Sequence, residues 1–340
     1  MSIPYRTQQT LKRLAVTLLI LLVVAAIVWA LWILWLQRFV VYTRDAGAII
    51  DFEVPQTLAV GQEALPPEED TQIEIHYNEG EGMVSISKEL TQLKGYYLMP
   101  ADLSADTEAL WQQIQTLPTS TAIMMDVKNI YGEFFYATGT GRPISEDVSA
   151  SAVEDLIGKL KNKGYYLIAR VPALRDRAYG LENVMSGLPT KEGYLWMDGD
   201  GCYWLNPTKE DTVSYLINIA QELRDMGFNE VVFEEFRFPD TQQIVFKADK
   251  AQTLADTAQL LVTGCATDSF AVSFVTDGTW TAPTGRTRVY RNDVTNPAEL
   301  SLAVEESAVA DPVIGLVFIT NNVDVRFDAY SVLRPINLAH

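Results

Sequence analysis

The chain has 340 residues, of which 48% are apolar and 10% aromatic, a composition that can fill a large core and excludes a disordered chain. Its two cysteines exclude a small fold held together by disulfides. The 26 basic and 44 acidic residues give a net charge of −18, and a surface this acidic repels phosphate, so we expect no nucleic-acid partner. The only histidines are His76 and His340, which argues against a Ser-His-Asp triad or a histidine-ligated zinc. We expect no metal and no cofactor, and any acid–base chemistry must use carboxylates, tyrosine or lysine.

The first predicted element is residues 14–36, LAVTLLILLVVAAIVWALWILWL, a run of 23 residues without a charge. As a helix it spans roughly 34 Å, enough to cross a hydrocarbon core of about 30 Å. The alternative is a cleaved secretory signal, whose apolar region is usually about 7–15 residues long. Trp29, Trp32 and Trp35 suit a membrane interface better than a cleavage site. We therefore expect an uncleaved transmembrane helix.

The basic residues on the amino side of this run set the expected orientation. Arg6, Lys12 and Arg13 precede it, and by the positive-inside rule residues 1–13 lie in the cytoplasm and the C-terminal domain lies outside the cytoplasm. Because residues 1–36 hold these three cations and no acid, the rest of the chain carries −18 − 3 = −21. We expect a single-pass membrane protein.

Residues 37–94 differ in composition from residues 95–340. The stretch PPEEDTQIEIHYNEGEG at 66–82 is acidic and turn-forming, with few large apolar side chains. AIIDFEV at 48–54 has strand-like content. We expect an acidic stalk or a small appended element here.

From residue 95 onward, short apolar runs alternate with amphipathic helical stretches. The runs predicted as strands are Tyr96–Met99, Ala122–Val127, Tyr165–Val171, Glu230–Phe236, Phe270–Thr276 and Val313–Ile319. Helical spacing predicts a helix around 153–160 with Ser151 and Glu154 as its capping box, and a second across 213–223 that ends at Gly227. A third helix is expected to start at Asn296-Pro297.

These elements predict an α/β fold. Strands that are apolar on both faces and separated by helices indicate parallel βαβ units. Seven or eight units within residues 95–340 favour a (β/α)8 TIM-like barrel, with a second half that could be incomplete or degenerate, and a doubly wound open sheet is the alternative. No Gly-x-Gly-x-x-Gly follows an early strand, which argues against a dinucleotide site.

In such a barrel the chemistry lies at the carboxyl ends of the strands. Four runs end in polar residues, which are Asp126 and Lys128, Arg170 with Arg175 and Asp176, Glu234 with Glu235 and Arg237, and Asp277. Each residue alone could be a helix cap, a loop ion pair or a solvated turn. Four strand ends that each present a carboxylate favour a site in which neighbouring acids differ in pKa.

Four blocks within residues 95–240 also carry a resemblance to a known family. They are Asp126-Val127-Lys128 with Gly132; Tyr166-Leu167-Ile168-Ala169-Arg170 with Asp176; Trp196-x-Asp198 with Gly201-x-x-Trp204-x-Asn206-Pro207; and Gly227-Phe228-x-Glu230 through Arg237-Phe238-Pro239. In order and spacing they resemble the bacterial putative glycosyl hydrolase domain, a TIM-barrel type often found behind a membrane anchor. The resemblance fades beyond Asp240.

The chain departs from that family's pattern at two places. Where the family has Asp followed by Tyr after its fourth strand, this sequence has Glu234 and Glu235. The longer Glu side chain displaces the carboxylate by roughly 1–1.5 Å, a shift that can weaken catalysis about a hundredfold. The family block with a histidine beside a tyrosine has no counterpart here, and Tyr290 is its nearest remnant.

The strand ends supply the candidate residues, and the resemblance, not the periodicity, makes the choice of Glu234. Glu234 is the principal catalytic carboxylate, Asp126 the second and Asp277 the third. The expected substrate-binding residues are Lys128, Arg170, Asp176, Trp196, Trp204 and Arg237, with Tyr203 as a further ring that could stack on sugar. Alternation puts Glu234 on one strand face with Val232 and Phe236, and Glu235 on the other. We expect Glu235 to pair with Arg237 or another cation, and Arg170 to lie close to Asp126 or Glu234.

Two functions remain open. The first is a membrane-anchored extracytoplasmic glycoside hydrolase that acts on a polysaccharide through paired carboxylates. The alternative is a catalytically inactive barrel that serves as a carbohydrate-binding or partner-binding module at the cell surface. Cys202 and Cys265 are expected to be buried free thiols. The glycan, its linkage and the oligomeric state stay open.

Overall fold

The computed structural model describes the strands β1 (Val40–Thr43) and β2 (Gly47–Ile50) and residues 89–336. Contacts divide the chain into two units, Met1–Gly80 and Glu81–His340. In the first unit β1 and β2 pair antiparallel. The strand β2 overlaps the start of the predicted strand-like stretch at 48–54, whereas β1 was not predicted. The predicted transmembrane helix at 14–36 lies outside the described residues. Within the described part of the chain, no helix is both long and apolar enough to cross a bilayer.

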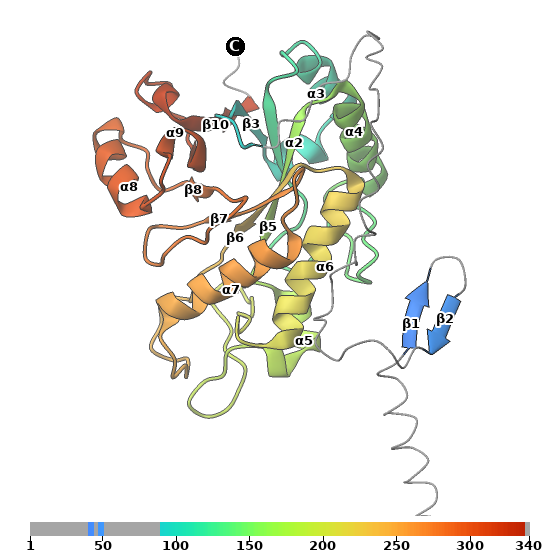
Figure 1. The fold of residues 1–340 in the computed structure, drawn as a ribbon, viewed down its shortest axis with the longest axis vertical. Helices are drawn as coiled ribbons and strands as arrows, with labels where there is room; N and C mark the ends of the chain where they lie inside the picture. Colours follow the sequence, from blue (N-terminus) through green and yellow to red (C-terminus); the bar gives the residue numbers. More distant parts are fainter. Residues whose placement is uncertain (1–39, 44–46, 51–88, 337–340) are drawn as a thin grey trace, which may run out of the picture. The chain divides into compact units, whose positions relative to one another are not determined.

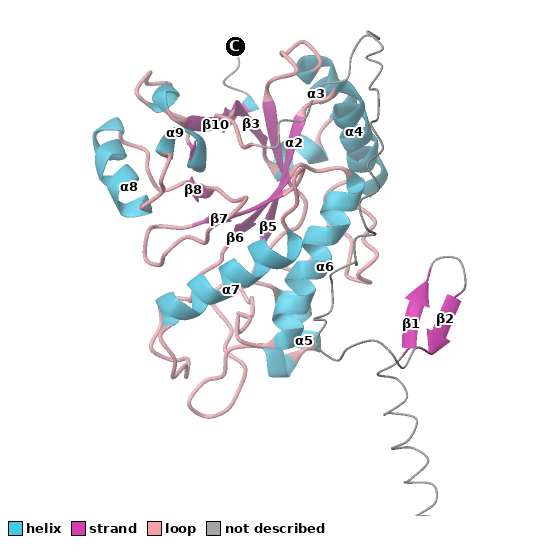
Figure 2. Cartoon of the chain, in the orientation of Figure 1, coloured by secondary structure: helices cyan, strands magenta, loops and turns pink. Residues whose placement is uncertain are grey.

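The second unit contains a closed barrel of eight parallel strands in the order β10-β3-β4-β5-β6-β7-β8-β9 (Figures 1 and 2). The strands are β3 (Lys94–Leu98), β4 (Ala122–Asp126), β5 (Tyr166–Pro172), β6 (Glu230–Glu234), β7 (Ala271–Val275), β8 (Val289–Arg291), β9 (Leu316–Ile319) and β10 (Ser331–Pro335). The predicted TIM-like barrel is therefore confirmed. Because β10 pairs with β3 and closes the sheet, the open doubly wound alternative is wrong.

Helices follow most of the strands and cover the outside of the barrel (Figure 2). They are α2 (Pro100–Ser104), α3 (Thr107–Ile114), α4 (Ala150–Lys163), α5 (Arg177–Glu182), α6 (Glu210–Met226), α7 (Lys250–Cys265), α8 (Leu300–Ser307) and α9 (Pro312–Gly315), with short 3-10 turns η2 (Val184–Ser186), η3 (Pro297–Glu299) and η4 (Phe327–Ala329). Within residues 89–336 no helix separates β7 from β8, and only η4 separates β9 from β10. The second half of the barrel is thus the reduced half, as the sequence suggested.

Two sets of apolar side chains show which face of each strand looks inward. Ile123, Leu167 and Val231 join the large core that includes Leu156, Leu160, Leu216 and Ile219 of α4 and α6, so these residues face the helices. Met124, Ile168 and Val232 form a separate cluster with Tyr290, Val317 and Leu333 from strands across the barrel, so they fill its interior. Since side chains alternate along a strand, Asp126, Arg170 and Glu234 continue the interior rows toward the carboxyl ends.

Several local predictions are confirmed. The helix α6 ends at Gly227, whose φ of +104° is the left-handed geometry that favours glycine at this position. Asn296 caps the turn η3 with its side chain and Pro297 follows at the first helical position, as predicted. Cys202 and Cys265 are buried free thiols.

Other local predictions are wrong. Helix α4 begins at Ala150 with Ser149 as its cap, and Glu154 instead accepts a hydrogen bond from the Ala137 amide, so the Ser151–Glu154 capping box does not form. The apolar run at 313–319 divides into α9 and β9, because Pro312 starts a helical turn. The short strands β8 and β10 were not predicted.

Candidate functional site

The carboxyl ends of β4, β5 and β6 bring three charged side chains together at the mouth of the barrel. Asp126 is the last residue of β4 and Arg170 lies opposite it on β5. Glu234 is the last residue of β6, which is the next strand. Because β4, β5 and β6 are neighbours in the parallel sheet, the guanidinium of Arg170 lies between the carboxylates of Asp126 and Glu234.

The sequence predicted that Arg170 lies close to Asp126 or Glu234, and it contacts both. Its Nε and Nη2 donate to Oδ1 and Oδ2 of Asp126 at 2.5 and 2.9 Å, a bidentate pair. Its Nε also lies 3.6 Å from Oε2 of Glu234. Because both distances start from the same Nε, Oδ1 of Asp126 and Oε2 of Glu234 are at most about 6 Å apart. Burial by itself lowers the pKa of Arg170, but the hydrogen bond and charge of Asp126 outweigh it and the net shift is upward.

Glu234 is held more loosely than Asp126. Its side chain is 26% exposed, against 11% for Asp126. Its Oε1 accepts one hydrogen bond, at 3.3 Å, from Nδ2 of Asn292, which directly follows β8. Burial raises the pKa of the Glu234 carboxyl, and the nearby charge of Arg170 opposes this shift without cancelling it. Glu234 therefore holds a proton more readily than an exposed carboxyl does.

A cavity of about 280 Å³ adjoins Glu234 on the side of β7 and β8. Its lining residues are Glu234, Glu235, Phe236, Arg237, Val275, Thr276, Asp277, Trp280, Asn292 and Asp293. Asp277 is exposed, and its side chain accepts a hydrogen bond from the amide of Thr279. Glu234 and Asp277 thus share one cavity, whereas Asp126 and Arg170 lie behind Glu234 and do not line it.

Glu235, the residue after β6, has a left-handed backbone with φ of +50° and lines the same cavity as Glu234. Its carboxylate lies 2.8 Å from Nη2 of Arg237 and 3.5 Å from Nη1 of Arg175, so the predicted ion pair is confirmed. A non-glycine residue in this conformation carries strain, which is common at functional sites. The left-handed backbone at Glu235 ends the alternation of side chains along β6. Phe236 packs on Phe274 in the core between barrel and helices, so the prediction that Phe236 shares the face of Glu234 is wrong.

Lys128 and Asp176 form a sealed ion pair. Nζ of Lys128 lies 2.7 Å from Oδ2 of Asp176, and neither side chain is exposed. Asp176 also accepts hydrogen bonds from the hydroxyl of Tyr215 and the amide of Tyr179. A side chain on Gly132, whose φ is +83°, would collide with Asp176. The structure thus places both predicted substrate-binding residues inside the protein, where they join the β4 loop to α5 and α6.

The aromatic loop between α5 and α6 is mostly folded onto itself. Trp204 is 3% exposed and packs with Leu188 and Ile244, and its Nε1 donates to Oδ2 of Asp198 at 2.9 Å. Trp196 is half-buried and donates to Gln243 at 2.9 Å. Trp204 therefore cannot stack on a sugar as it stands. Its ring instead lies under the guanidinium of Arg237, at 4.9 Å, which fixes Arg237 at the edge of the cavity.

Two residues at the mouth were not singled out from the sequence. Asn292 follows β8, a strand of three residues that carries too short an apolar run to be recognised. Tyr97 of β3 packs against the interior cluster, and the charges of Arg170 and Asp126 act on its hydroxyl, whose pKa is raised mainly by burial. Tyr97 lies within the predicted strand at 96–99, but alternation alone does not tell which face of that strand looks into the barrel.

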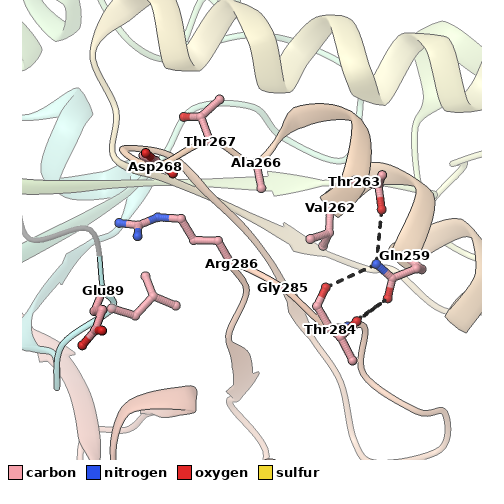
Figure 3. A pocket seen from close by; sticks show the side chains of 11 residues that line it. Glu89, Gln259, Val262, Thr263, Ala266, Thr267, Asp268, Thr284, Gly285 and Arg286 are labelled. Carbon is pink, nitrogen blue, oxygen red and sulfur yellow. Dashed lines mark hydrogen bonds between the residues drawn. The ribbon is translucent and has the colours of Figure 1, made fainter. Parts of the chain in front are cut away.

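A larger cavity, of about 710 Å³, lies at the amino ends of the strands, opposite Glu234. Figure 3 shows the side chains that line it. It is lined by α7 and by the residues that precede β7 and β8, including Asp268 and Arg286. Gln259 ties its wall together through hydrogen bonds with Thr284. Because the amino ends of the strands meet here, we assign this face to stability and not to chemistry. Among the described residues, no three His, Cys, Asp or Glu side chains group as a metal site would require.

Comparison with known proteins agrees with this architecture. Residues 99–267 match the sequence model of a family described as a putative glycosyl hydrolase domain. No curated protein matches the chain. This family match supports a glycoside hydrolase-like barrel, and it covers the strand ends that carry Asp126, Arg170 and Glu234.

Three solved structures are similar to this chain at low sequence identity. A hypothetical protein from Ruminiclostridium thermocellum is 18% identical over 52% of this chain and 96% of that one, with a TM-score of 0.46. An α-galactosidase from Lactobacillus brevis is 9% identical over 73% of this chain and 38% of that one, with a TM-score of 0.49. A GH36 α-galactosidase from Geobacillus stearothermophilus in complex with raffinose is 8% identical over 74% and 39%, with a TM-score of 0.51. The chain spans less than two fifths of either α-galactosidase, and the likeness is one of fold alone.

Proposed function

We propose that this protein is a membrane-anchored, extracytoplasmic glycoside hydrolase that acts on a glycan through Glu234 and Asp277. The observation that carries the proposal is the environment of Glu234: a carboxyl with a raised pKa, at the mouth of a TIM-like barrel, beside a cavity that a second acid also lines. Glycoside hydrolysis needs such a pair, one acid protonated and one ionised. The family match over residues 99–267 supports the same reaction class.

In the proposed mechanism Glu234 is the general acid. Its proton passes to the glycosidic oxygen as the bond to the leaving sugar breaks. The carboxylate of Asp277 either activates water or attacks the sugar carbon, and the configuration of the product distinguishes these routes. Asp126 acts through Arg170: by holding the guanidinium in a bidentate pair, it keeps Arg170 from pairing fully with Glu234.

The test is incubation of the purified full-length protein, in detergent, with a panel of cell-wall and storage glycans. We expect release of reducing sugar from at least one glycan, and loss of that release in both Glu234→Gln and Asp277→Asn. The comparison variant is Glu235→Gln, which changes the neighbouring acid of the same cavity, one already paired with Arg175 and Arg237. If Asp277→Asn kept full turnover, the assignment of the second carboxylate would be wrong.

One observation favours the second function, a carbohydrate-binding module without catalysis. The guanidinium of Arg170 contacts both Asp126 and Glu234, so its charge opposes the protonation of Glu234. A glycan that binds the wild type and Glu234→Gln equally well, with no product after prolonged incubation, would support the binding module and contradict hydrolysis.

The anchor and the location outside the cytoplasm rest on the sequence of residues 1–36. Protease added to intact cells should digest the barrel and leave a short protected N-terminal fragment. Complete protection of the chain would contradict this orientation.

A further inference from the structure

We propose that the cavity beside Glu234 binds a single terminal sugar ring that carries no carboxylate, so that the protein acts at the ends of neutral or amino-sugar glycans. The inference rests on the proposed function and specifies its substrate. It follows from the size, the walls and the charge of this cavity.

The size of the cavity limits what can enter. Its volume is about 280 Å³, at or below the lower end of the roughly 300–1,000 Å³ that drug-sized ligands occupy. This is room for one sugar ring with little to spare. Its lining comes from the ends of three neighbouring strands, β6, β7 and β8. A polysaccharide that crosses an active site would need a groove that extends beyond them.

The walls of the cavity are rigid. Phe236 and Trp280 line it, and both pack on Phe274, with ring centroids 4.8 and 5.7 Å away. Phe236 also contacts Trp280 at 5.6 Å, so the three rings form one buried cluster. Enlarging the cavity would separate interlocked aromatic rings, which costs several contacts at once.

Charged side chains stand behind Glu234 and at the rim of the cavity. Behind Glu234 lies the bidentate pair of Arg170 and Asp126. At the rim, the half-exposed Arg237 is held by Glu235 and by the face of Trp204. A ring that reaches Glu234 therefore meets a closed end, and the rest of the glycan must leave through the open side. This is the geometry of a chain-end subsite.

The charge of the lining selects against anionic sugars. Four carboxylates line the cavity, from Glu234, Glu235, Asp277 and Asp293, against the single guanidinium of Arg237. Arg237 is paired with Glu235, and Asp293 is bound by Arg291 outside the lining. Asp277 is exposed, and its one hydrogen bond within residues 89–336 comes from a backbone amide. A uronic acid would place its carboxylate beside these acids with no cation left to receive it.

The test measures binding separately from turnover. Saturation-transfer NMR on the full-length protein in detergent would use methyl glycosides of neutral hexoses and of hexosamines, and methyl glycosides of the matching uronic acids. We expect at least one neutral or amino glycoside to bind, and its uronic acid counterpart to bind about tenfold more weakly or not at all. Asn292→Trp should fill the cavity and abolish the signal. Ser301→Trp, an exposed position on α8, is the control and should keep it.

Product analysis separates this inference from the proposed function. A hexasaccharide labelled at its reducing end should lose single residues from the other end. Products of intermediate length at early times would overturn the chain-end subsite while hydrolysis stands. Single-ring binding without any product would support the subsite and contradict hydrolysis. Equal binding of a uronic acid glycoside, or no binding by any single ring, would overturn the inference.

Discussion

Glu230 and Glu234 lie four residues apart on the same face of β6, and their surroundings are opposite. Glu230, at the amino end of the strand, is fully buried. Its carboxylate receives hydrogen bonds from the hydroxyls of Tyr166 and Tyr290 at 2.9 Å each, from Ser273 at 2.6 Å and from Arg288 at 2.5 Å. Every oxygen of Glu230 is satisfied, as a buried charge requires.

Within residues 89–336, Glu234 at the carboxyl end receives one hydrogen bond, at 3.3 Å, and has one ion-pair contact, at 3.6 Å. It is a quarter exposed and faces a cavity. The comparison shows how one strand can carry a structural and a functional acid. The barrel saturates the first with donors, and it leaves the second short of donors, so that its protonation state can change.

The largest expected effect on stability comes from Glu230, whose carboxylate has every hydrogen bond satisfied. Glu230→Gln removes the charge that Arg288 faces and should lower the free energy of unfolding by about 3–5 kcal/mol, because one member of a buried ion pair is left without its partner. Denaturant unfolding followed by tryptophan fluorescence measures the loss. A loss below about 1 kcal/mol would show that the two ends of β6 are not as different as their contacts indicate.

A second sealed pair sharpens the same comparison. Lys128→Met leaves Asp176 buried without its cation and should cost somewhat less than Glu230→Gln, because the hydroxyl of Tyr215 still donates to Asp176. The measurement is again denaturant unfolding. An unchanged stability combined with weaker glycan binding would return Lys128 to the substrate-binding residues.

At Glu234 the expected change in stability is small and depends on pH. Its folded-state pKa is raised, so the stability that the protonated carboxyl provides is complete below the unfolded value near 4.5 and is lost as pH rises through the folded value. Gln cannot ionise. Glu234→Gln should therefore match the wild type in Tm near about pH 4 and exceed it near about pH 8, by roughly 2–4 °C for each kcal/mol gained.

The control for this titration is Glu192→Gln, an exposed glutamate in the loop between η2 and α6. Its difference in Tm from the wild type should not grow with pH. A Tm for Glu234→Gln that falls below the wild type as pH rises would mean that the ionised carboxylate stabilises the fold.

The smallest expected effect concerns Asp126. Its charge raises the pKa of Glu234, and it holds Arg170, whose charge lowers that pKa. Asp126→Asn removes the negative charge of Asp126 and leaves Arg170 free to pair with Glu234, so the pKa of Glu234 should fall. The alkaline limb of the pH–rate profile, which requires protonated Glu234, should then move to lower pH. A limb that stays in place, with kcat reduced at every pH, would favour direct participation of Asp126.

The first half of the barrel could be predicted from the sequence, and the second half only in part. Ala122–Asp126 and Tyr166–Pro172 are long apolar runs, and the prediction located both. Val289–Arg291 has three residues and ends in an arginine, and Ser331–Pro335 contains Arg334, so neither reads as a buried strand. Because β8 was not predicted, Asn292, which directly follows it, could not be recognised as a strand-end residue.

The candidate site divides in a similar way. The contacts of Arg170 and of Glu235 followed from strand ends and charge. The burial of Lys128 and Asp176 did not, because both residue types are mostly exposed and only tertiary contacts reveal a sealed pair. The left-handed backbone at Glu235 also has no signature in the sequence, since glycine or asparagine would normally mark it. That one residue decides where Phe236 and Arg237 point.

The most direct test of this account compares turnover in Glu234→Gln and Glu235→Gln on whichever glycan the wild type degrades. We expect Glu234→Gln to lower kcat by about 100- to 10,000-fold, the range for loss of a general acid, without loss of folding stability. Glu235→Gln should keep most of the activity, because its carboxylate is committed to Arg175 and Arg237. An inactive Glu235→Gln beside an active Glu234→Gln would contradict the central claim that Glu234 is the functional acid.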